Sequence, residues 1–199
     1  MPQLLLATTN PGKIREYRLL LAGLGYRIVT LSEQGITAAA EQGESYEQNA
    51  GMKAAACAKL SRLITLADDS GLEVDALNGK PGVHSARYAG ENATDADRVA
   101  KLLARLSGVP RDKRTAHFKC VIAIATPEGR LDLCQGSCHG IIAPEAKGEN
   151  GFGYDPVFYL PELGKTLAEL PLELKNKLSH RGKAARKAKK ILAQRQLSY

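Results

Sequence analysis

The stretch that decides the fold is Leu63-Ile64-Thr65-Leu66-Ala67-Asp68-Asp69-Ser70-Gly71-Leu72. Its apolar first half is typical of the end of a buried strand, which delivers two adjacent carboxylates to its tip. Neighbouring carboxylates repel each other, so at a buried position they need a cation, donors or a shared proton. Mg²⁺ is usually held by one or two carboxylates together with water and phosphate oxygens, so the pattern favours Mg²⁺ and phosphate chemistry. The alternative is a surface turn in which Asp68 caps the loop and Asp69 is solvated.

Predicted strands and helices alternate on both sides of this acidic stretch, which itself is expected to be a loop at 68–71. The predicted strands span residues 4–7, 27–31, 63–67, 72–76, 115–126, 131–142 and 157–160. Helices are predicted from near Lys13, from Ser45 to about residue 60, after Thr94, around Ala168, and over 172–196 with an interruption near 179–182. The tight turn Pro127-Glu128-Gly129 joins two of the strands into a hairpin. This order predicts an α/β fold with a mixed sheet.

The composition is that of an ordinary globular protein. With 199 residues, 44% of them hydrophobic, the chain predicts one domain, residues 1–199, built in two lobes. The first residues lack the basic region of a signal peptide, and no apolar run approaches membrane-spanning length, so we expect no membrane partner. The four cysteines have no metal-binding spacing and are predicted to be reduced, buried thiols of a cytoplasmic protein.

The net charge of +7 is concentrated at one end of the chain. Residues 174–199 hold nine Lys or Arg and no acid, so the remainder carries 19 basic residues against 21 acidic ones. Such a segment can be a solvated helix face, a nucleic-acid patch or the wall of a site for a polyanion such as a nucleotide.

Two loops and one helix are candidates for ligand contact. The loop Thr8-Thr9-Asn10-Pro11-Gly12 leads from a strand into a helix. The amides at the start of this helix, together with Lys13, can bind an anion. The alternative is that the loop only caps the helix and leaves Lys13 exposed. The helix that begins after Ser45 is predicted to expose Lys53 and Lys59. The loop Gly151-Phe152-Gly153-Tyr154-Asp155-Pro156 interleaves glycines with aromatic residues, which suits close backbone approach to a flat ligand.

Taken together, these motifs resemble those of the inosine/xanthosine triphosphate pyrophosphatases, also called Ham1-like proteins. The resemblance covers essentially the whole chain. The motifs that carry it are Thr8-Thr9-Asn10-Pro11-Gly12-Lys13, Ala67-Asp68-Asp69-Ser70-Gly71-Leu72, Pro81-Gly82-Val83-His84-Ser85-Ala86-Arg87-Tyr88, Gly151-Phe152-Gly153-Tyr154-Asp155-Pro156 and Ser179-His180-Arg181-Gly182.

The resemblance implies a dimeric, Mg²⁺-dependent enzyme that hydrolyses deaminated purine nucleoside triphosphates, ITP, dITP and XTP, to the monophosphate and pyrophosphate. It also implies two lobes around a long mixed sheet, with the nucleotide in the cleft between them. By position, Asp69 is the catalytic proton acceptor, and the metal ligands are Asp69, Asp68 and Glu41. The residues that it assigns to the substrate are Thr8, Thr9, Asn10, Pro11, Gly12, Lys13 and Lys53 at the phosphates, Ser70, and Phe152, Gly153, Tyr154, Asp155, Lys175, His180 and Arg181 at the base and sugar.

The base preference has a physical rationale. Phe152 or Tyr154 can stack on the purine, and His180 or Arg181 can donate to a 6-keto oxygen. Adenine presents an amino donor at that position, so a pocket lined by donors disfavours ATP.

The chain departs from the family pattern at two places. It has Ala40-Glu41 where many relatives carry two consecutive glutamates, and Glu47-Gln48 where a second acid is expected. Glu41, one position away from the expected ligand, could therefore bind the metal in its place, or the metal could be bound by Asp68, Asp69 and water.

Two alternatives to the whole assignment remain. One is a related Maf-like pyrophosphatase acting on pyrimidine or modified nucleotides, and the other is a module that binds nucleic acid through its basic C-terminal helix. We expect no nucleic-acid partner.

Overall fold

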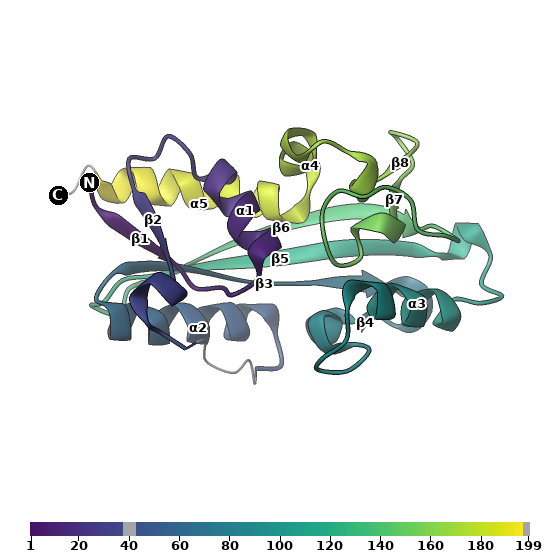
Figure 1. Cartoon of the computed structure of the whole chain (residues 1–199), viewed down its shortest axis with the longest axis horizontal. Coiled ribbons are helices and arrows are strands. Elements are labelled where there is room, and N and C mark those ends of the chain that lie inside the picture. The colour runs from purple at the N-terminus through teal and green to yellow at the C-terminus, as the bar shows by residue number, and fades with distance from the viewer. Residues whose placement is uncertain (38–42, 197–199) are drawn as a thin grey trace. The chain divides into compact units, whose positions relative to one another are not determined.

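The computed structural model describes residues 1–37 and 43–196, which form a mixed sheet of eight strands with flanking helices and confirm the predicted α/β class (Figure 1). The strands are β1 (Gln3–Leu6), β2 (Arg27–Thr30), β3 (Ile64–Val74), β4 (Lys80–Pro81), β5 (Thr115–Ala125), β6 (Leu131–Ile142), β7 (Phe158–Leu160) and β8 (Lys165–Thr166). The α-helices are α1 (Pro11–Leu20), α2 (Tyr46–Ser61), α3 (Asp95–Arg105), α4 (Leu172–Leu178) and α5 (His180–Gln196). Short 3₁₀ helices are η1 (Ser32–Gln34), η2 (Asp75–Leu77), η3 (Gly82–Arg87), η4 (Arg111–Lys113), η5 (Asp155–Val157) and η6 (Leu167–Glu169).

The sheet has the strand order β2-β1-β3-β5-β6-β7-β8, and β4 pairs with β3. β1 runs parallel to both β2 and β3, whereas β6, β7 and β8 are antiparallel neighbours. The register places Leu6, the last residue of β1, opposite Leu66 of β3. β3 therefore continues past the carboxyl end of β1, which is where parallel strands commonly bind ligands.

The prediction of an acidic loop at 68–71 between two short strands is wrong. β3 runs without interruption from Ile64 to Val74, and Asp68 and Asp69 lie in its middle at 1% and 4% exposure. The alternative of a solvated surface turn is wrong for the same reason. Tertiary context overrides the turn preference of Asp-Asp-Ser-Gly, because β1 and β5 are the neighbours of β3 and side-chain donors meet both carboxylates.

The chain divides into two compact units. Unit 1 comprises residues 1–69, 120–136 and 181–199, and unit 2 comprises 70–119 and 137–180. β3, β5 and β6 each contribute residues to both units. The predicted nucleotide cleft between two lobes stays a prediction.

In unit 1, α2 lies on one face of the strands and α1 and α5 lie on the other (Figure 1). The core under α1 and α5 joins Leu66 and Ile122 of the strands to Tyr17 of α1. On α5, Ala184, Ala185 and Ala188 are all fully buried, and these small side chains let the helix approach the sheet closely.

Unit 2 has a core of its own. It contains Leu72 of β3, Leu102 of α3, Phe118 of β5 and Phe158 of β7. The predicted hairpin is present as β5 and β6. The predicted break near 179–182 is present at Ser179, which separates α4 from α5, but the prediction is wrong for residues 180–182, which belong to α5. None of the helices in the described parts of the chain combines the length and apolar character needed to span a bilayer.

Candidate active site

The first loop forms the strand-to-helix turn that the sequence predicts. Asn10 caps α1, since its Oδ1 accepts a hydrogen bond from the Lys13 amide at 3.0 Å, and the Asn10 amide donates to Thr8 Oγ1 at 3.2 Å. α1 begins at Pro11, slightly before the predicted position, with proline at a place where its missing amide hydrogen costs nothing. This connection places Lys13 in the first helical turn of α1, beside the carboxyl end of β1.

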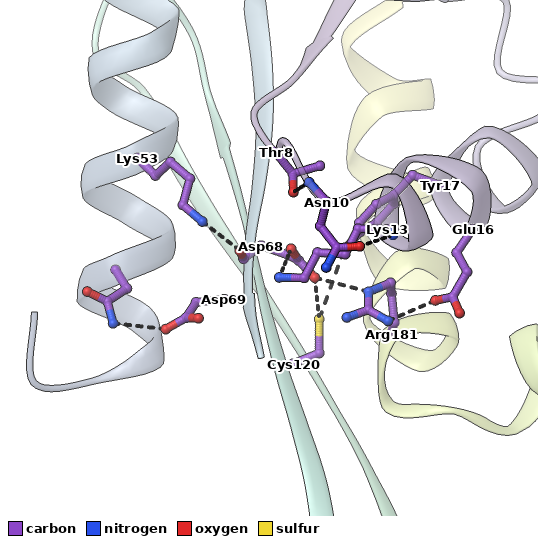
Figure 2. Close-up of polar contacts among 11 residues, drawn as sticks. Thr8, Asn10, Lys13, Glu16, Tyr17, Lys53, Asp68, Asp69, Cys120 and Arg181 are labelled. Carbon is purple, nitrogen blue, oxygen red and sulfur yellow. Dashed lines mark hydrogen bonds and ion pairs between the residues drawn. The ribbon is translucent and has the colours of Figure 1, made fainter. Parts of the chain in front are cut away.

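The Asp68 carboxylate is enclosed by cationic side chains. Lys13 Nζ lies 2.7 Å from its Oδ1, and Arg181 Nε donates to Oδ2 at 3.0 Å (Figure 2). The Cys120 thiol, 3.7 Å away, donates to the same Oδ2. Burial on its own would raise the pKa of Asp68, but Lys13, Arg181 and then Lys53 outweigh burial and hold that pKa well below its usual range. Asp68 is therefore expected to be ionised in the core at neutral pH.

Arg181 is held from two sides. Its Nη1 donates to Glu16 Oε2 at 2.8 Å, in addition to the bond from Nε to Asp68, and the side chain is only 3% exposed. Burial opposes the charged guanidinium, but Asp68 and Glu16 outweigh it and raise the pKa of Arg181 above its ordinary value. Arg181 was predicted to line the base pocket, whereas its two carboxylate partners belong to α1 and β3 of unit 1.

Asp69 points to the opposite face of β3 from Asp68, toward α2 (Figure 2). Its Oδ2 accepts a hydrogen bond from Asn49 Nδ2 at 2.9 Å. Lys53 lies one helical turn after Asn49 and donates from Nζ to the main-chain oxygen of Asp68 at 3.1 Å. The prediction that Lys53 is exposed is wrong, because the whole residue retains 7% exposure, whereas Lys59 is exposed as predicted.

Of the adjacent pair Asp68 and Asp69, Asp69 is the carboxylate that could hold a metal. No group of three His, Cys, Asp or Glu among the described residues is close enough together to hold an ion, and Glu41 lies outside the residues that the structure describes. Asp68 already has two cations on its oxygens, and Asp69 projects from the other face of the strand. A single carboxylate fits Mg²⁺, which often takes one protein ligand and completes its shell with phosphate oxygens and water.

The aromatic loop and Lys175 form a second polar cluster, in unit 2. Asp155 Oδ2 accepts from the Phe152 amide at 2.8 Å and forms an ion pair with Lys175 Nζ, both side chains being almost completely buried. Lys175 Nζ also lies 4.8 Å from the centre of the Phe152 ring, a cation–π contact. The structure thus brings Phe152, Asp155 and Lys175 together as a buried charged group beside an aromatic face.

The other predicted base-pocket residues are also fixed in unit 2. The His180 ring stacks on Phe118 with centroids 4.5 Å apart, and the Tyr154 hydroxyl donates to the main-chain oxygen of Ser85 at 2.9 Å. Ser85 Oγ in turn accepts from the Leu72 amide at 2.9 Å, which ties this loop to β3.

The predicted site residues therefore fall into two sets. Unit 1 holds Thr8, Thr9, Asn10, Pro11, Gly12, Lys13, Lys53, Asp68, Asp69 and Arg181, and unit 2 holds Ser70, Phe152, Gly153, Tyr154, Asp155, Lys175 and His180. Sequence reasoning missed Glu16 and Asn49. Asn49 has a signal in hindsight, because it precedes Lys53 by four residues on α2 and so lies on the same helix face.

Comparison with known proteins places the chain in a family. The model of the Ham1 family matches residues 4–191. A protein of Desulforamulus reducens named dITP/XTP pyrophosphatase is 55% identical over 191 residues, 96% of this chain and 95% of that protein. One of the same name from Bacillus subtilis is 45% identical over 193 residues, 96% of this chain and 98% of that one. The chain belongs to the Ham1 family.

Solved structures agree with this assignment. The structure of a HAM1 protein from Coxiella burnetii is similar with a TM-score of 0.88 and 42% sequence identity, over 98% of this chain and 100% of that one. The Staphylococcus aureus Ham1 protein gives a TM-score of 0.85 at 41% identity, over 97% and 99% of the two chains.

Proposed function

We propose that this protein is a nucleoside triphosphate pyrophosphatase that hydrolyses ITP, dITP and XTP to the monophosphate and pyrophosphate. The observation that carries the proposal is the convergence of Lys13 and Lys53 on Asp68, beside Asp69 and the amino end of α1. Cationic side chains and helix amides bind a triphosphate, and the Asp69 carboxylate lies on β3 next to Asp68. Similarity to the dITP/XTP pyrophosphatases over almost the whole chain supports the substrate class.

The proposed reaction is attack of water on the α-phosphorus. The new bond joins the water oxygen to that phosphorus, the bond to the oxygen bridging the α- and β-phosphates breaks, and pyrophosphate leaves. Asp69, oriented by Asn49, accepts the proton of the attacking water. Lys13 and Lys53 stabilise the negative charge that develops on the leaving pyrophosphate.

We assign the metal to Asp69 and the substrate phosphates, with Mg²⁺ as the ion. When bound, Mg²⁺ supplies charge neutralisation at the phosphates. Asp68 is left out of the ligand set, because Lys13 and Arg181 occupy its two oxygens.

For the base, we propose that Phe152 stacks on the purine and that Lys175 and His180 supply donors toward a 6-keto oxygen. Asp155 holds Lys175 in place for this role. We move Arg181 from the base to the phosphate end, since its partners are Asp68 and Glu16.

We further propose a cytoplasmic homodimer. On unit 1, Met52, Leu131 and Leu133 are 51%, 45% and 43% exposed. A Cβ on Gly51 would lie 3.4 Å from Leu131, so part of this apolar surface is continuous from α2 to β6 and suits a second copy. Sedimentation at increasing protein concentration tests the dimer, and a Leu131→Lys variant is expected to shift the mass to that of one chain.

The function is tested by incubating the protein with dITP, ITP, XTP, ATP and GTP, with Mg²⁺ or with a chelator, and measuring pyrophosphate and orthophosphate separately. We expect pyrophosphate from the three deaminated nucleotides only, and only with the metal. Orthophosphate as the product would contradict attack at the α-phosphorus. Equal turnover of ATP would contradict the proposed base recognition.

A further inference from the structure

A buried chain of four alternating charges runs from α1 through β3 to α5 and back to α1 (Figure 2). Lys13 contacts Asp68 at 2.7 Å, Asp68 contacts Arg181 at 3.0 Å, and Arg181 contacts Glu16 at 2.8 Å. The side chains of Asp68 and Glu16 are completely buried, and those of Arg181 and Lys13 are 3% and 15% exposed. The charges alternate along the chain, so every buried charge has an opposite neighbour.

Glu16 is a member of this series of charges that neither the substrate nor the metal assignments include. It lies one helical turn after Lys13 on α1, so both side chains leave the same face of the helix. A buried carboxylate is costly unless it is paired, and the Arg181 guanidinium supplies that pair. Glu16 contacts Nη1 of Arg181 and Asp68 contacts Nε, so the two carboxylates together fix the plane of the guanidinium.

We infer that Glu16 is a positioning residue for the phosphate-binding end of the site. By holding Arg181, Glu16 fixes the Asp68 carboxylate, and Asp68 in turn fixes the Lys13 amine beside the Thr8 to Gly12 loop. The inference rests on the proposed function, because it gives Lys13 the phosphates as its target. Without the Glu16 charge, Arg181 loses one of the two carboxylates that hold its guanidinium, so the guanidinium and the Asp68 carboxylate bonded to it can shift relative to Lys13.

The test is a double-mutant cycle between Glu16→Gln and Lys13→Ala, measured as kcat/KM for dITP. Glu16→Gln alone is expected to lower kcat/KM by about 10-fold to about 100-fold, as displacement of a positioned group does. In the Lys13→Ala background the same change is expected to lower it by less than about 3-fold, because the group that Glu16 positions is already gone. Glu162→Gln, which removes an exposed glutamate of unit 2, is the matched control and is expected to leave kcat/KM unchanged.

Two further measurements keep the inference testable. Circular dichroism gives the folded fraction, so that kcat/KM is counted per folded molecule. Glu16→Asp keeps the charge and is expected to have a higher kcat/KM than Glu16→Gln. If Glu16→Gln does not fold, Glu16→Asp replaces it in the cycle. Fully additive losses in the cycle, or losses that only follow the folded fraction, would overturn the inference. A wild-type chain that does not hydrolyse dITP would instead overturn the proposed function on which the inference rests.

Discussion

Asp68 and Asp69 are neighbours in the sequence, yet their side chains leave β3 on opposite faces of the sheet and meet different partners. Asp68 faces Lys13 and Arg181, whereas Asp69 faces Asn49 of α2. The alternation of a β-strand separates the two charges, so they do not need to share a metal to coexist. The structure thus divides one acidic pair into a carboxylate that balances the protein's own cations and a carboxylate that we assign to the reaction.

This division predicts different consequences for two similar substitutions. Asp69→Asn is expected to lower kcat for dITP by about 100-fold or more, the scale of a lost general base, with little change in the free energy of unfolding. Asp68→Asn is expected to lower that free energy by about 3 to 5 kcal/mol, because Arg181 and Lys13 lose their shared counter-charge. Steady-state kinetics and urea unfolding of both variants check the pair. Asp112→Asn, at an exposed position, serves as the control, and full turnover by Asp69→Asn would remove Asp69 from the reaction.

The lowered pKa of Asp68 predicts how stability depends on pH. In the unfolded chain this carboxyl takes up a proton near its ordinary pKa of about 3.9, whereas in the folded chain it stays ionised below that pH. The stabilisation from Asp68 is therefore fully present above about pH 4 and is lost as the pH falls through the folded pKa. Urea midpoints measured from pH 6 to pH 2 are expected to fall less steeply below pH 4 in Asp68→Asn than in the wild type. Identical slopes would show that Asp68 has no such role.

Two glycines of the aromatic loop offer a matched comparison. Gly151 and Gly153 have φ of +78° and +65°, so alanine at either position costs about 1 to 2 kcal/mol of backbone strain. A Cβ on Gly151 would also lie 2.1 Å from Asp155 Oδ2, whereas a Cβ on Gly153 would meet nothing within 4 Å. Gly151→Ala is therefore expected to displace Asp155 from Lys175 and to raise KM for dITP well above that of Gly153→Ala. Equal KM values in the two variants would argue against a substrate role for this cluster.

The Cys120 thiol is predicted to be inert in the folded protein. Burial, followed by the nearby charge of Asp68, raises its pKa to about 12, so at pH 8 it is present almost entirely as the thiol. In the described structure the other cysteines, Cys57, Cys134 and Cys138, are also buried and outside any disulfide, as the sequence predicts. A thiol reagent such as DTNB is expected to react with none of them in buffer and with all four in urea. A fast reaction that disappears in Cys120→Ala would contradict this expectation.

Much of the fold could be predicted from local patterns. Helical periodicity and the capping residues Ser45 and Thr94 located α2 and α3, and the Pro127-Glu128-Gly129 turn located the hairpin of β5 and β6. These signals act over a few residues, so the sequence contains them in full. The turn-preferring residues of the acidic stretch predict a loop, whereas the partners that keep the stretch extended come from distant segments.

The candidate site was predicted less completely for the same reason. Lysines on helices are usually solvated, so the sequence predicts an exposed Lys53. Its burial depends on a hydrogen bond to the main-chain oxygen of Asp68, and the spacing of residues on α2 does not indicate this partner. Glu16 resembles an ordinary surface glutamate until Arg181 is placed beside it. Only the family motifs indicated which residues belong to one site, and they did not separate Arg181 from His180, although the two lie in different units.

Glu16 and Arg181 are 165 residues apart in the sequence, and this separation has a consequence for synthesis on the ribosome. At a translation rate of 5 to 20 residues per second, about 8 to 33 s pass between the addition of Glu16 and that of Arg181. Glu16 has no Arg181 beside it during that interval, and neither has Asp68 from its own addition onward. The contacts of Glu16 and Asp68, in the first third of the polypeptide, with Arg181 can therefore form only after the last tenth of the polypeptide has begun to be synthesised.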